Sequence, residues 1–428
     1  MCSWSGSIES HFTNQHATGF YNNVCILGHY TAPEGLFSAG TSTSIKPLVY
    51  TALHTLIAAH PMLSAIAINE ITNPVFVRLP FVDLDQAVRF YDGAPGDFNA
   101  YLEAQHNERF TQPFWRVVVH TLDGRGRFMV SFIFHHALGD GGTGMAFHRG
   151  FQAALPTAAL SRAVSARAVP PPSPLLPALE ACYDPAALTT TPPPALPADI
   201  WTGSAITAAD LATRVHTLAL PAATLARMVA RCRAERATVT ALLHAATAAA
   251  FLADVPQAYA GIRVTGAMSM RRFLPAIADD AVGCWVTGFA DTQLRAPLAR
   301  AGGVWDEARR VCALLQALVA TGNTGAVRAC ATPAEKYAAL LGTRRHGGAI
   351  EVSNLGLYDG GSAGGWAVAD VVFSQSASVA GAAVEFSFVS TRGGGLAVGA
   401  SWQECAVATA TVKRGLEEMV RQIDAALA

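Results

Sequence analysis

The sequence contains no uninterrupted apolar run long enough to cross a bilayer, although 51% of its 428 residues are hydrophobic and its mean hydropathy is +0.29. Alanine-rich stretches such as ALLHAATAAAFLA (241–253) account for the positive mean hydropathy. That stretch is interrupted by His244 and Thr247 and followed by Asp254, so it is not a spanning segment. The N-terminus shows no basic segment followed by an apolar one, as a secretory signal would. We therefore expect a packed cytoplasmic protein without stable membrane insertion.

Charged residues and paired cysteines are also scarce. Lys, Arg, Asp and Glu make up only 14% of the chain, and the net charge is −1 with no basic stripe, so nucleic acid is not an expected partner. The eight cysteines are scattered and none form a CxxC pair, so a zinc knuckle is not supported. We expect reduced, buried thiols.

Apolar periodicity predicts helices and strands in both halves of the chain. Helical spacing covers residues 46–63, 144–155, 225–252 and 411–427, with a break in the third segment near Arg236 to Thr238. Apolar, β-rich runs cover residues 115–122, 127–134, 214–221, 349–356, 384–389 and 396–402. Between the halves, the sequences PPPSPLLP and TPPPALP cannot continue a regular helix, because proline lacks an N–H donor.

This pattern indicates an α/β (α+β) fold of two lobes. We expect an N-terminal lobe over residues 1–197, which includes the proline-rich linker 156–197, and a C-terminal lobe over residues 198–428. Each half mixes helices with strands and does not follow a regular βαβ repeat. A monomer is expected.

The segment FIFHHALGDGGTG (132–144) places two histidines, an aspartate and four glycines directly after an apolar strand. Successive side chains of an extended chain diverge, so one histidine is expected to pack inward while the other faces a cleft. The glycines are expected to allow positive φ and close backbone approach. Asp140 either orients an imidazole or holds the loop by pairing with a distant arginine.

A neutral imidazole in such a cleft is a good general base toward a hydroxyl. The sequence has no GxSxG elbow, so the histidine would activate the substrate's own hydroxyl or amine and not an enzyme nucleophile. A metal site is disfavoured, because adjacent histidines do not share a helix face and no HExxH motif accompanies them. A purely structural loop is the other alternative.

The sequence HHALGDG (135–141) resembles the HHxxxDG motif of the chloramphenicol acetyltransferase-like superfamily, which includes peptide-synthetase condensation domains and CoA-dependent acyltransferases. Other segments are similar, in order, to fungal alcohol O-acetyltransferases: IESHFTNQHATGFYNNVCILGHY (8–30), AAHPMLSA (58–65), RATVTALLHAA (236–246), MSMRRFLP to GCWVTG (268–288), EVSNLGLY (351–358) and FSQSASVAG (373–381). The DFGWG motif of the plant branch is absent, which favours the fungal branch.

The resemblance implies two similar lobes with an active-site tunnel between them. It implies that His136 is the general base, that Asp140 is mainly structural and pairs with Arg271 or Arg272, and that the Gly141 N–H helps to polarise a carbonyl. Polar contacts in the tunnel are expected from Ser353, Asn354, Ser374 and Gln375.

Three further side chains are assigned on the same resemblance. His135 is expected to be a packed, hydrogen-bonded histidine at the edge of the substrate site. Trp285 and Trp366 either line the acceptor pocket or belong to the core, which is the more common place for tryptophan.

The function that the resemblance implies is an acyl-CoA-dependent O-acyltransferase. It would transfer acetyl directly from acetyl-CoA to the hydroxyl of a specialised-metabolite alcohol, with no metal and no tightly bound cofactor. The alternatives are a condensation-like enzyme that catalyses CoA-independent cyclisation, esterification or rearrangement, and a non-catalytic binding protein. The sequence leaves open the acceptor, the acyl chain length and the choice between O- and N-acylation.

Overall fold

The apolar runs that precede the histidine segment form the centre of the first sheet. The structure is a computed structural model that describes residues 2–4, 6–37, 44–123, 126–161, 164–184, 196–207, 211–327, 334–345 and 347–428. Both predicted strands form, as β7 and β8, and they pair antiparallel with Trp115 opposite Phe134. The strand order is β15–β16–β2–β8–β7–β6, and these strands span Ser362–Ala363, Trp366–Gln375, Val24–Thr31, Arg127–Phe134, Trp115–Thr121 and Val88–Asp92.

Side chains alternate between the two faces of this sheet, and helices cover both faces. Phe132 of β8 packs in an apolar cluster with residues of α2 and α5, whereas Ile133 packs in a smaller cluster with Leu102 of α4. The three helices are α2 (Ile45–Ala59), α5 (Gly141–Ala158) and α4 (Phe98–Asn107). The predicted helix at 46–63 ends earlier than expected because Pro61 begins a separate 3-10 turn.

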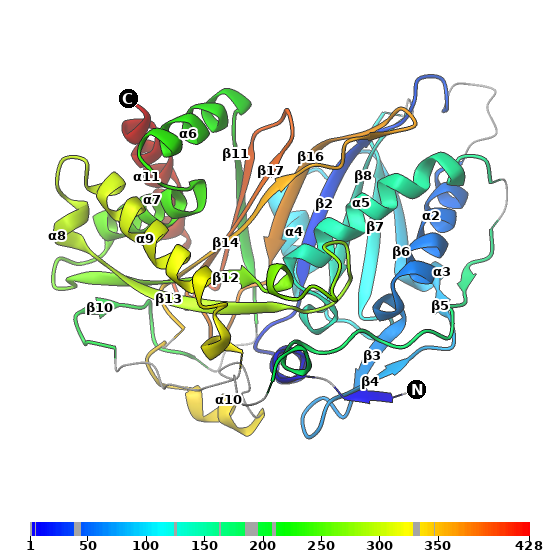
Figure 1. Cartoon of the computed structure of the whole chain (residues 1–428), viewed down its shortest axis with the longest axis horizontal. Helices are drawn as coiled ribbons and strands as arrows, with labels where there is room; N and C mark the ends of the chain where they lie inside the picture. Colours follow the sequence, from blue (N-terminus) through cyan, green and yellow to red (C-terminus); the bar gives the residue numbers. More distant parts are fainter. Residues whose placement is uncertain are drawn as a thin grey trace.

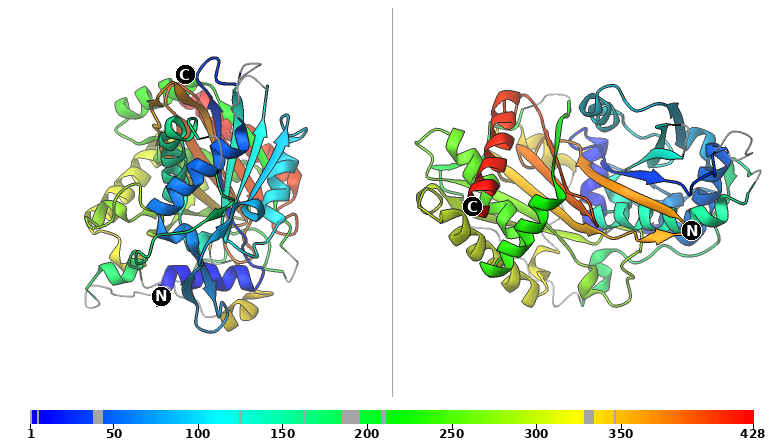
Figure 2. Two further views of the ribbon diagram at one scale, coloured as in Figure 1. Left: turned by 90° about the vertical axis from the view of Figure 1, so that its right-hand side faces the viewer. Right: turned by 90° about the horizontal axis from the view of Figure 1, so that it is seen from above.

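The second sheet has seven strands and lies beside the first (Figure 1). Its order is β10–β12–β14–β17–β18–β11, spanning Ile200–Trp201, Gly261–Ser269, Ile350–Tyr358, Val384–Thr391, Leu396–Trp402 and Arg214–Leu220, with β13 (Val286–Leu294) paired to β12. Its apolar face packs on the helices α6 (Ala222–Ala234), α7 (Val239–Asp254), α9 (Gly303–Ala320) and α11 (Thr409–Leu427). Figure 2 shows α11 in this second lobe, distant from the N-terminus.

The predicted break between α6 and α7 is confirmed. Arg236 adopts a positive φ of 55° there, and the Thr238 side chain accepts a hydrogen bond from the Ala241 N–H at 3.1 Å. Within the described ranges no single helix is long and apolar enough to cross a bilayer. Only α6 and α7 taken together reach that length and composition, and they are bent by 102° at their break.

The chain does not divide between the two sheets at one point. The strands β15 and β16 come late in the chain, yet β16 pairs with β2 of the first sheet, with Phe373 opposite Ile26. The predicted boundary between residues 197 and 198 therefore does not separate the sheets. The described part of the predicted linker runs along the first lobe, where Arg78 donates hydrogen bonds to the carbonyls of Pro171 and Ser173. Residues 185–195 of that linker lie outside the described residues.

Small elements complete the description. A three-stranded sheet has the order β1–β4–β3, and β5 pairs with β9 of the linker. Their bounds, with those of the remaining helices, are β1 (Cys2–Trp4), β3 (Ala65–Ile68), β4 (Val75–Arg78), β5 (Val82–Asp83), β9 (Arg167–Ala168), α1 (Ser7–Ala17), α3 (Leu84–Ala87), α8 (Arg295–Leu298) and α10 (Ala334–Leu340).

The close approach of α5 to β2 gives a prediction about stability. A methyl group at Gly144 would collide with the Ile26 side chain, so we expect Gly144→Ala to lower the free energy of unfolding by about 1–3 kcal/mol. At Gly150 of the same helix the nearest atom, on Leu56, lies 3.7 Å from the added methyl position. Gly150→Ala should therefore raise stability by up to about 1 kcal/mol through its helix propensity. Urea denaturation measures both changes, and equal effects of the two substitutions would contradict the proposed packing.

Candidate active site

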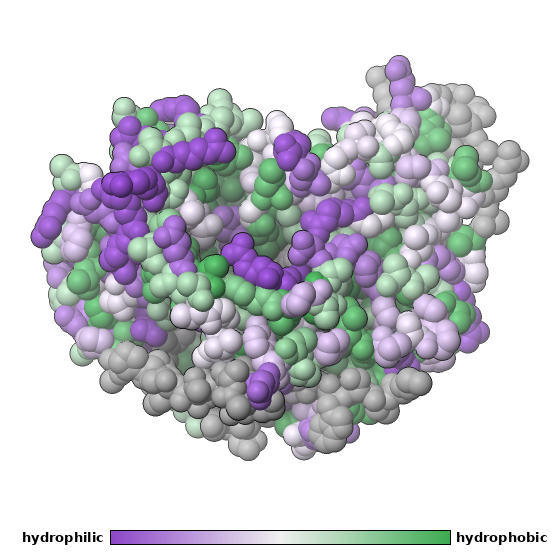
Figure 3. Space-filling view, in the orientation of Figure 1, coloured by the Kyte–Doolittle hydropathy of each residue, from purple (hydrophilic) through white to green (hydrophobic). Residues whose placement is uncertain are grey.

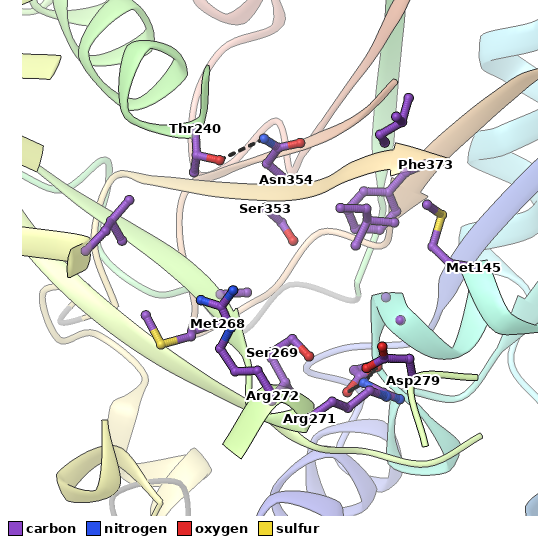
Figure 4. A pocket seen from close by; sticks show the side chains of 18 of the residues that line it. Met145, Thr240, Met268, Ser269, Arg271, Arg272, Asp279, Ser353, Asn354 and Phe373 are labelled. Carbon is purple, nitrogen blue, oxygen red and sulfur yellow. Dashed lines mark hydrogen bonds and ion pairs between the residues drawn. The ribbon is translucent and has the colours of Figure 1, made fainter. Parts of the chain in front are cut away.

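A cavity of about 1300 Å³ lies between the two lobes, and both lobes contribute to its wall. Figure 3 shows hydrophilic residues gathered around the hollow between the two halves of the molecule. In the close view of Figure 4, Met145 enters from α5, Ser353 and Asn354 from β14, and Met268 and Ser269 from β12. The cavity therefore lies where residues from distant parts of the sequence meet.

His136 borders this cavity immediately after β8. Its ring stacks on Phe12 with centroids 3.6 Å apart, Tyr21 lies at 5.8 Å, and the Cys284 sulfur lies 3.9 Å from Nδ1. Burial lowers the pKa of His136 to about 4, although a backbone hydrogen bond and the Asp140 charge act to raise it. The imidazole is therefore neutral at pH 7 and able to accept a proton.

His135 is buried on the other side of the loop and does not line the cavity. Its Nδ1 accepts a hydrogen bond from the Ala137 N–H at 3.0 Å, and its ring stacks on Phe114 with centroids 4.8 Å apart. This is the packed histidine that the sequence predicts, but it does not lie where it would touch a substrate in the cavity.

His135 also belongs to a group of three potential metal ligands with His16 and Glu70. His16 Nδ1 lies 3.4 Å from a Glu70 carboxylate oxygen. Because His135 Nδ1 accepts a hydrogen bond, the proton of its neutral ring is on Nε2, which then has no lone pair for a metal. This geometry disfavours a metal at His135, although the Nε2 atoms of His16 and His135 are both buried without a hydrogen-bond partner among the described residues.

Asp140 forms a buried ion pair with Arg271, the residue that follows β12 and Met270 in the second lobe. One guanidinium nitrogen lies 2.7 Å from both carboxylate oxygens, and the other donates to the Gly283 carbonyl at 3.1 Å. Asp140 also caps α5 by accepting from the Thr143 N–H, and it accepts from the Trp285 N–H at 2.9 Å. Of the two predicted roles, Asp140 therefore fills the structural one, and Arg271 is its partner.

The glycines of the loop allow neighbouring groups to approach the backbone closely. None of the four adopts the left-handed backbone of positive φ, so that expectation is wrong. A methyl group at Gly141 would collide with Leu355 of the second lobe. At Gly142 it would lie 2.7 Å from an Arg271 guanidinium nitrogen. The absence of side chains here allows the two lobes to approach each other beside the cavity.

Besides His136, Asp140 and Arg271, four more of the predicted polar residues line the cavity: Arg272, Ser353, Asn354 and Gln375. In Figure 4, Arg272 extends into the open space. The Asn354 amide donates to the Thr240 hydroxyl at 2.9 Å, which connects β14 to the start of α7. The Gln375 amide donates to Glu351 at 3.2 Å.

Besides His135, three predicted residues lie outside the cavity wall. Ser374 is 2% exposed and its hydroxyl lies 2.8 Å from His106 Nε2, because alternate residues of β16 point in opposite directions. The Trp285 indole N–H donates to the Pro177 carbonyl at 3.1 Å, so this tryptophan holds the linker. Trp366 belongs to the core of the first lobe.

Five residues at the site are absent from the sequence-based assignment: Phe12, Tyr21, Arg149, Cys284 and Glu351. Four of them lie in or next to segments that resemble the family, but no local pattern of residue types marks them. The distance of Phe12, Tyr21, Cys284 and Glu351 from His136 in the sequence explains why these four were missed.

The C-terminal part of the chain, residues 335–423, matches a family model described as alcohol acetyltransferase. The chain is also 31% identical to a protein of Aspergillus fumigatus described as probable alcohol acetyltransferase crmB. That alignment covers 97% of this chain and 97% of the fungal protein.

Solved structures share the fold at low sequence identity. TRI3 trichothecene 15-O-acetyltransferase from Fusarium sporotrichioides matches with a TM-score of 0.74 and 11% identity, over 99% of this chain and 95% of that one. The first condensation domain of the calcium-dependent antibiotic synthetase, in complex with a substrate analogue, matches with a TM-score of 0.65 and 14% identity, over 100% and 97% of the two chains. These matches confirm the predicted two-lobed fold.

The buried ion pair predicts a large and specific stability effect. Asp140→Asn leaves the Arg271 guanidinium buried without its counter-charge, and we expect a loss of about 3–5 kcal/mol in the free energy of unfolding. The matched control is Asp359→Asn, which breaks an exposed pair with Arg392 and should change stability little. Chemical denaturation of both variants tests this, and a small loss in Asp140→Asn would contradict the structural role.

Proposed function

Because the chain belongs to the alcohol acetyltransferase family, we propose that it transfers an acetyl group from acetyl-CoA to the hydroxyl of a small-molecule alcohol. The observation that carries this proposal is a neutral imidazole, His136, on the wall of a cavity between the two lobes. The relative described as an alcohol acetyltransferase covers nearly the whole chain, which supports the same reaction class.

In the proposed reaction, His136 takes the proton from the acceptor hydroxyl. We assign the proton transfer to Nε2, with the ring's own proton on Nδ1, which faces the Cys284 sulfur. The oxygen attacks the thioester carbonyl, and the carbon–sulfur bond then breaks to give the ester and the CoA thiolate. The imidazolium returns its proton to the thiolate or to solvent. Low solvation keeps the ring neutral and able to accept a proton, but it also lowers the pKa of the imidazolium, because the charged form loses its hydration.

The start of α5 is the proposed site of carbonyl polarisation. Gly141 is the first residue of this helix and lines the cavity five positions after His136. Unpaired N–H groups and the helix dipole place partial positive charge at a helix N-terminus. An oxyanion that forms between His136 and Gly141 would be stabilised there, as donors in an oxyanion hole do.

The cavity is lined with polar side chains suited to two substrates, acyl-CoA and the alcohol. Arg272 extends into it, and Ser353, Asn354 and Gln375 contribute hydroxyl and amide groups. The proposed transfer is direct, so it uses neither an acyl-enzyme nor a tightly bound cofactor. Both substrates would meet beside His136.

The proposal predicts CoA release that depends on His136. Incubation of the purified protein with acetyl-CoA and a panel of primary and secondary alcohols should release free thiol, followed with a thiol reagent. We expect His136→Ala to lower kcat/KM by about 100- to 10,000-fold, the range that a general base contributes.

His54→Ala provides the matched control, because His54 contacts the Ser165 carbonyl and does not line the cavity. This variant should keep the activity of the unchanged protein, and circular dichroism should show both variants folded. If no alcohol in the panel supports thiol release that His136→Ala abolishes, the proposed function is wrong.

The lowered pKa of His136 predicts an unusual pH profile. Because the folded-state pKa is near 4, the base form persists as pH falls, and kcat/KM should stay level from pH 8 to about pH 5. An acid limb near the ordinary histidine value of about 6.5 would contradict the burial argument. Assays should be brief, because burial also lowers the pKa of His106 to about 3, so that acid conditions reduce stability. Recovery of activity on return to pH 7 is the control.

A further inference from the structure

The sheet of the second lobe has one apolar face and one polar face. The register places Glu351 of β14 beside Glu385 of β17, and Glu385 beside Ser401 of β18. Two positions further along, Ser353 lies beside Ser387. Partners in register point to the same side of a sheet, so these five side chains share one face. Glu351 and Ser353 line the cavity, which means that this polar face forms part of its wall.

Much of this face is buried without hydrogen-bond partners. Glu385 is 3% exposed, and one of its carboxylate oxygens has no partner. The hydroxyls of Ser387 and Ser401, each 1% exposed, have none either. Buried polar groups are normally paired, so this set forms an unsatisfied polar patch on the same sheet face as Glu351 and Ser353, which line the cavity.

The polar face connects to the proposed catalytic base through a short chain of contacts. Tyr21 lies beside His136 with ring centroids 5.8 Å apart, and its hydroxyl is 3.5 Å from the Gln375 amide oxygen. The Gln375 amide nitrogen in turn donates to Glu351 at 3.2 Å. A molecule whose hydroxyl reaches His136 can therefore place its other end toward Glu351.

The positive groups near the two carboxyls are already engaged elsewhere. Arg345, the arginine whose charge acts on Glu385, donates to the Ser204 carbonyl at 3.0 Å and to the Val379 carbonyl at 2.7 Å. Among the described residues no Lys, Arg or His forms an ion pair with Glu351 or Glu385. Apart from the charge of Arg345 that acts on Glu385, the described residues thus place no cation in direct contact with the carboxyl pair.

We propose that Glu351 and Glu385 form an acceptor subsite that binds a basic nitrogen carried by the alcohol, an inference that rests on the proposed acyl transfer. The protonated amine would lie against Glu351 at the cavity wall, with Glu385 behind it. Glu351 and Glu385 are thus specificity-determining residues, while His136 acts on the hydroxyl at the other end of the same molecule.

A cationic group fits this subsite better than a second hydroxyl does. Burial raises the pKa of Glu351 and of Glu385, and their mutual repulsion adds to the effect on Glu385. A bound ammonium would offset that repulsion by giving an ionised carboxylate a counter-charge. A neutral hydroxyl supplies only a hydrogen bond, which is worth less than one to a charged group.

Three acceptors of equal chain length test the proposal: dimethylaminohexanol, hexanediol and hexanol. The tertiary amine cannot itself be acylated to a stable amide, so thiol release from acetyl-CoA measures acylation of the hydroxyl alone. With the full chain and acetyl-CoA at neutral pH, we expect kcat/KM for the amino alcohol to exceed that for hexanol by about 10-fold or more, as a hydrogen bond to a charged group allows. Hexanediol should remain close to hexanol.

Glu351→Gln is the diagnostic variant, because Glu351 reaches the cavity and the change keeps the side-chain shape. In this variant the kcat/KM for the amino alcohol, divided by that for hexanol, should fall toward one. Glu385→Gln should also lower this ratio, provided that the variant folds. The matched control is Glu417→Gln on the exposed face of α11, which should leave the ratio unchanged. Ligand-observed NMR of the same alcohols gives a readout that does not require turnover.

The outcomes separate the two proposals. A ratio near one in the unchanged protein, with His136-dependent turnover of hexanol, would overturn the amine subsite and leave the acyltransferase intact. A hexanediol rate equal to that of the amino alcohol would show a neutral polar subsite, which also overturns it. If no alcohol is turned over, the proposed function fails, and NMR still decides whether the amino alcohol binds in a way that Glu351→Gln removes.

Discussion

The buried ion pair between Asp140 and Arg271 is the interaction on which the geometry of the site depends. Asp140 starts α5 in the first lobe, and Arg271 follows β12 in the second, so the pair joins the lobes at the cavity wall. Removal of two charges from water is costly, and it is offset here because one guanidinium nitrogen contacts both carboxylate oxygens while the other meets backbone carbonyls. The loop that carries His136 is thereby fixed with respect to both lobes.

Burial then sets the chemistry of the cavity. The same desolvation that lowers the pKa of His136 raises the pKa of Glu351, because in each case the charged form loses its hydration. Burial thus favours the neutral form of both side chains.

The position of strand β16 in the first sheet explains how residues distant in sequence reach the same wall of the cavity. This strand belongs to the later part of the chain but pairs with β2, and it brings Phe373 and Gln375 to the cavity. Its alternation turns Ser374 the other way, toward His106. Main-chain hydrogen bonds between β16 and β2 therefore tie the later part of the chain to the first sheet, and residues of both sheets line the cavity.

The sequence by itself determined the two-lobed α/β fold, the strand that ends at the histidines and the helix after them, because periodicity is a local property and the HHxxxDG motif is compact. It did not choose between Arg271 and Arg272, since adjacent side chains leave a strand end in different directions. Only the tertiary structure showed that the loop glycines serve contact between lobes. It alone placed Phe12 against the His136 ring and Glu351 on the wall of the same cavity, because residues so far apart in sequence meet only when both sheets are packed.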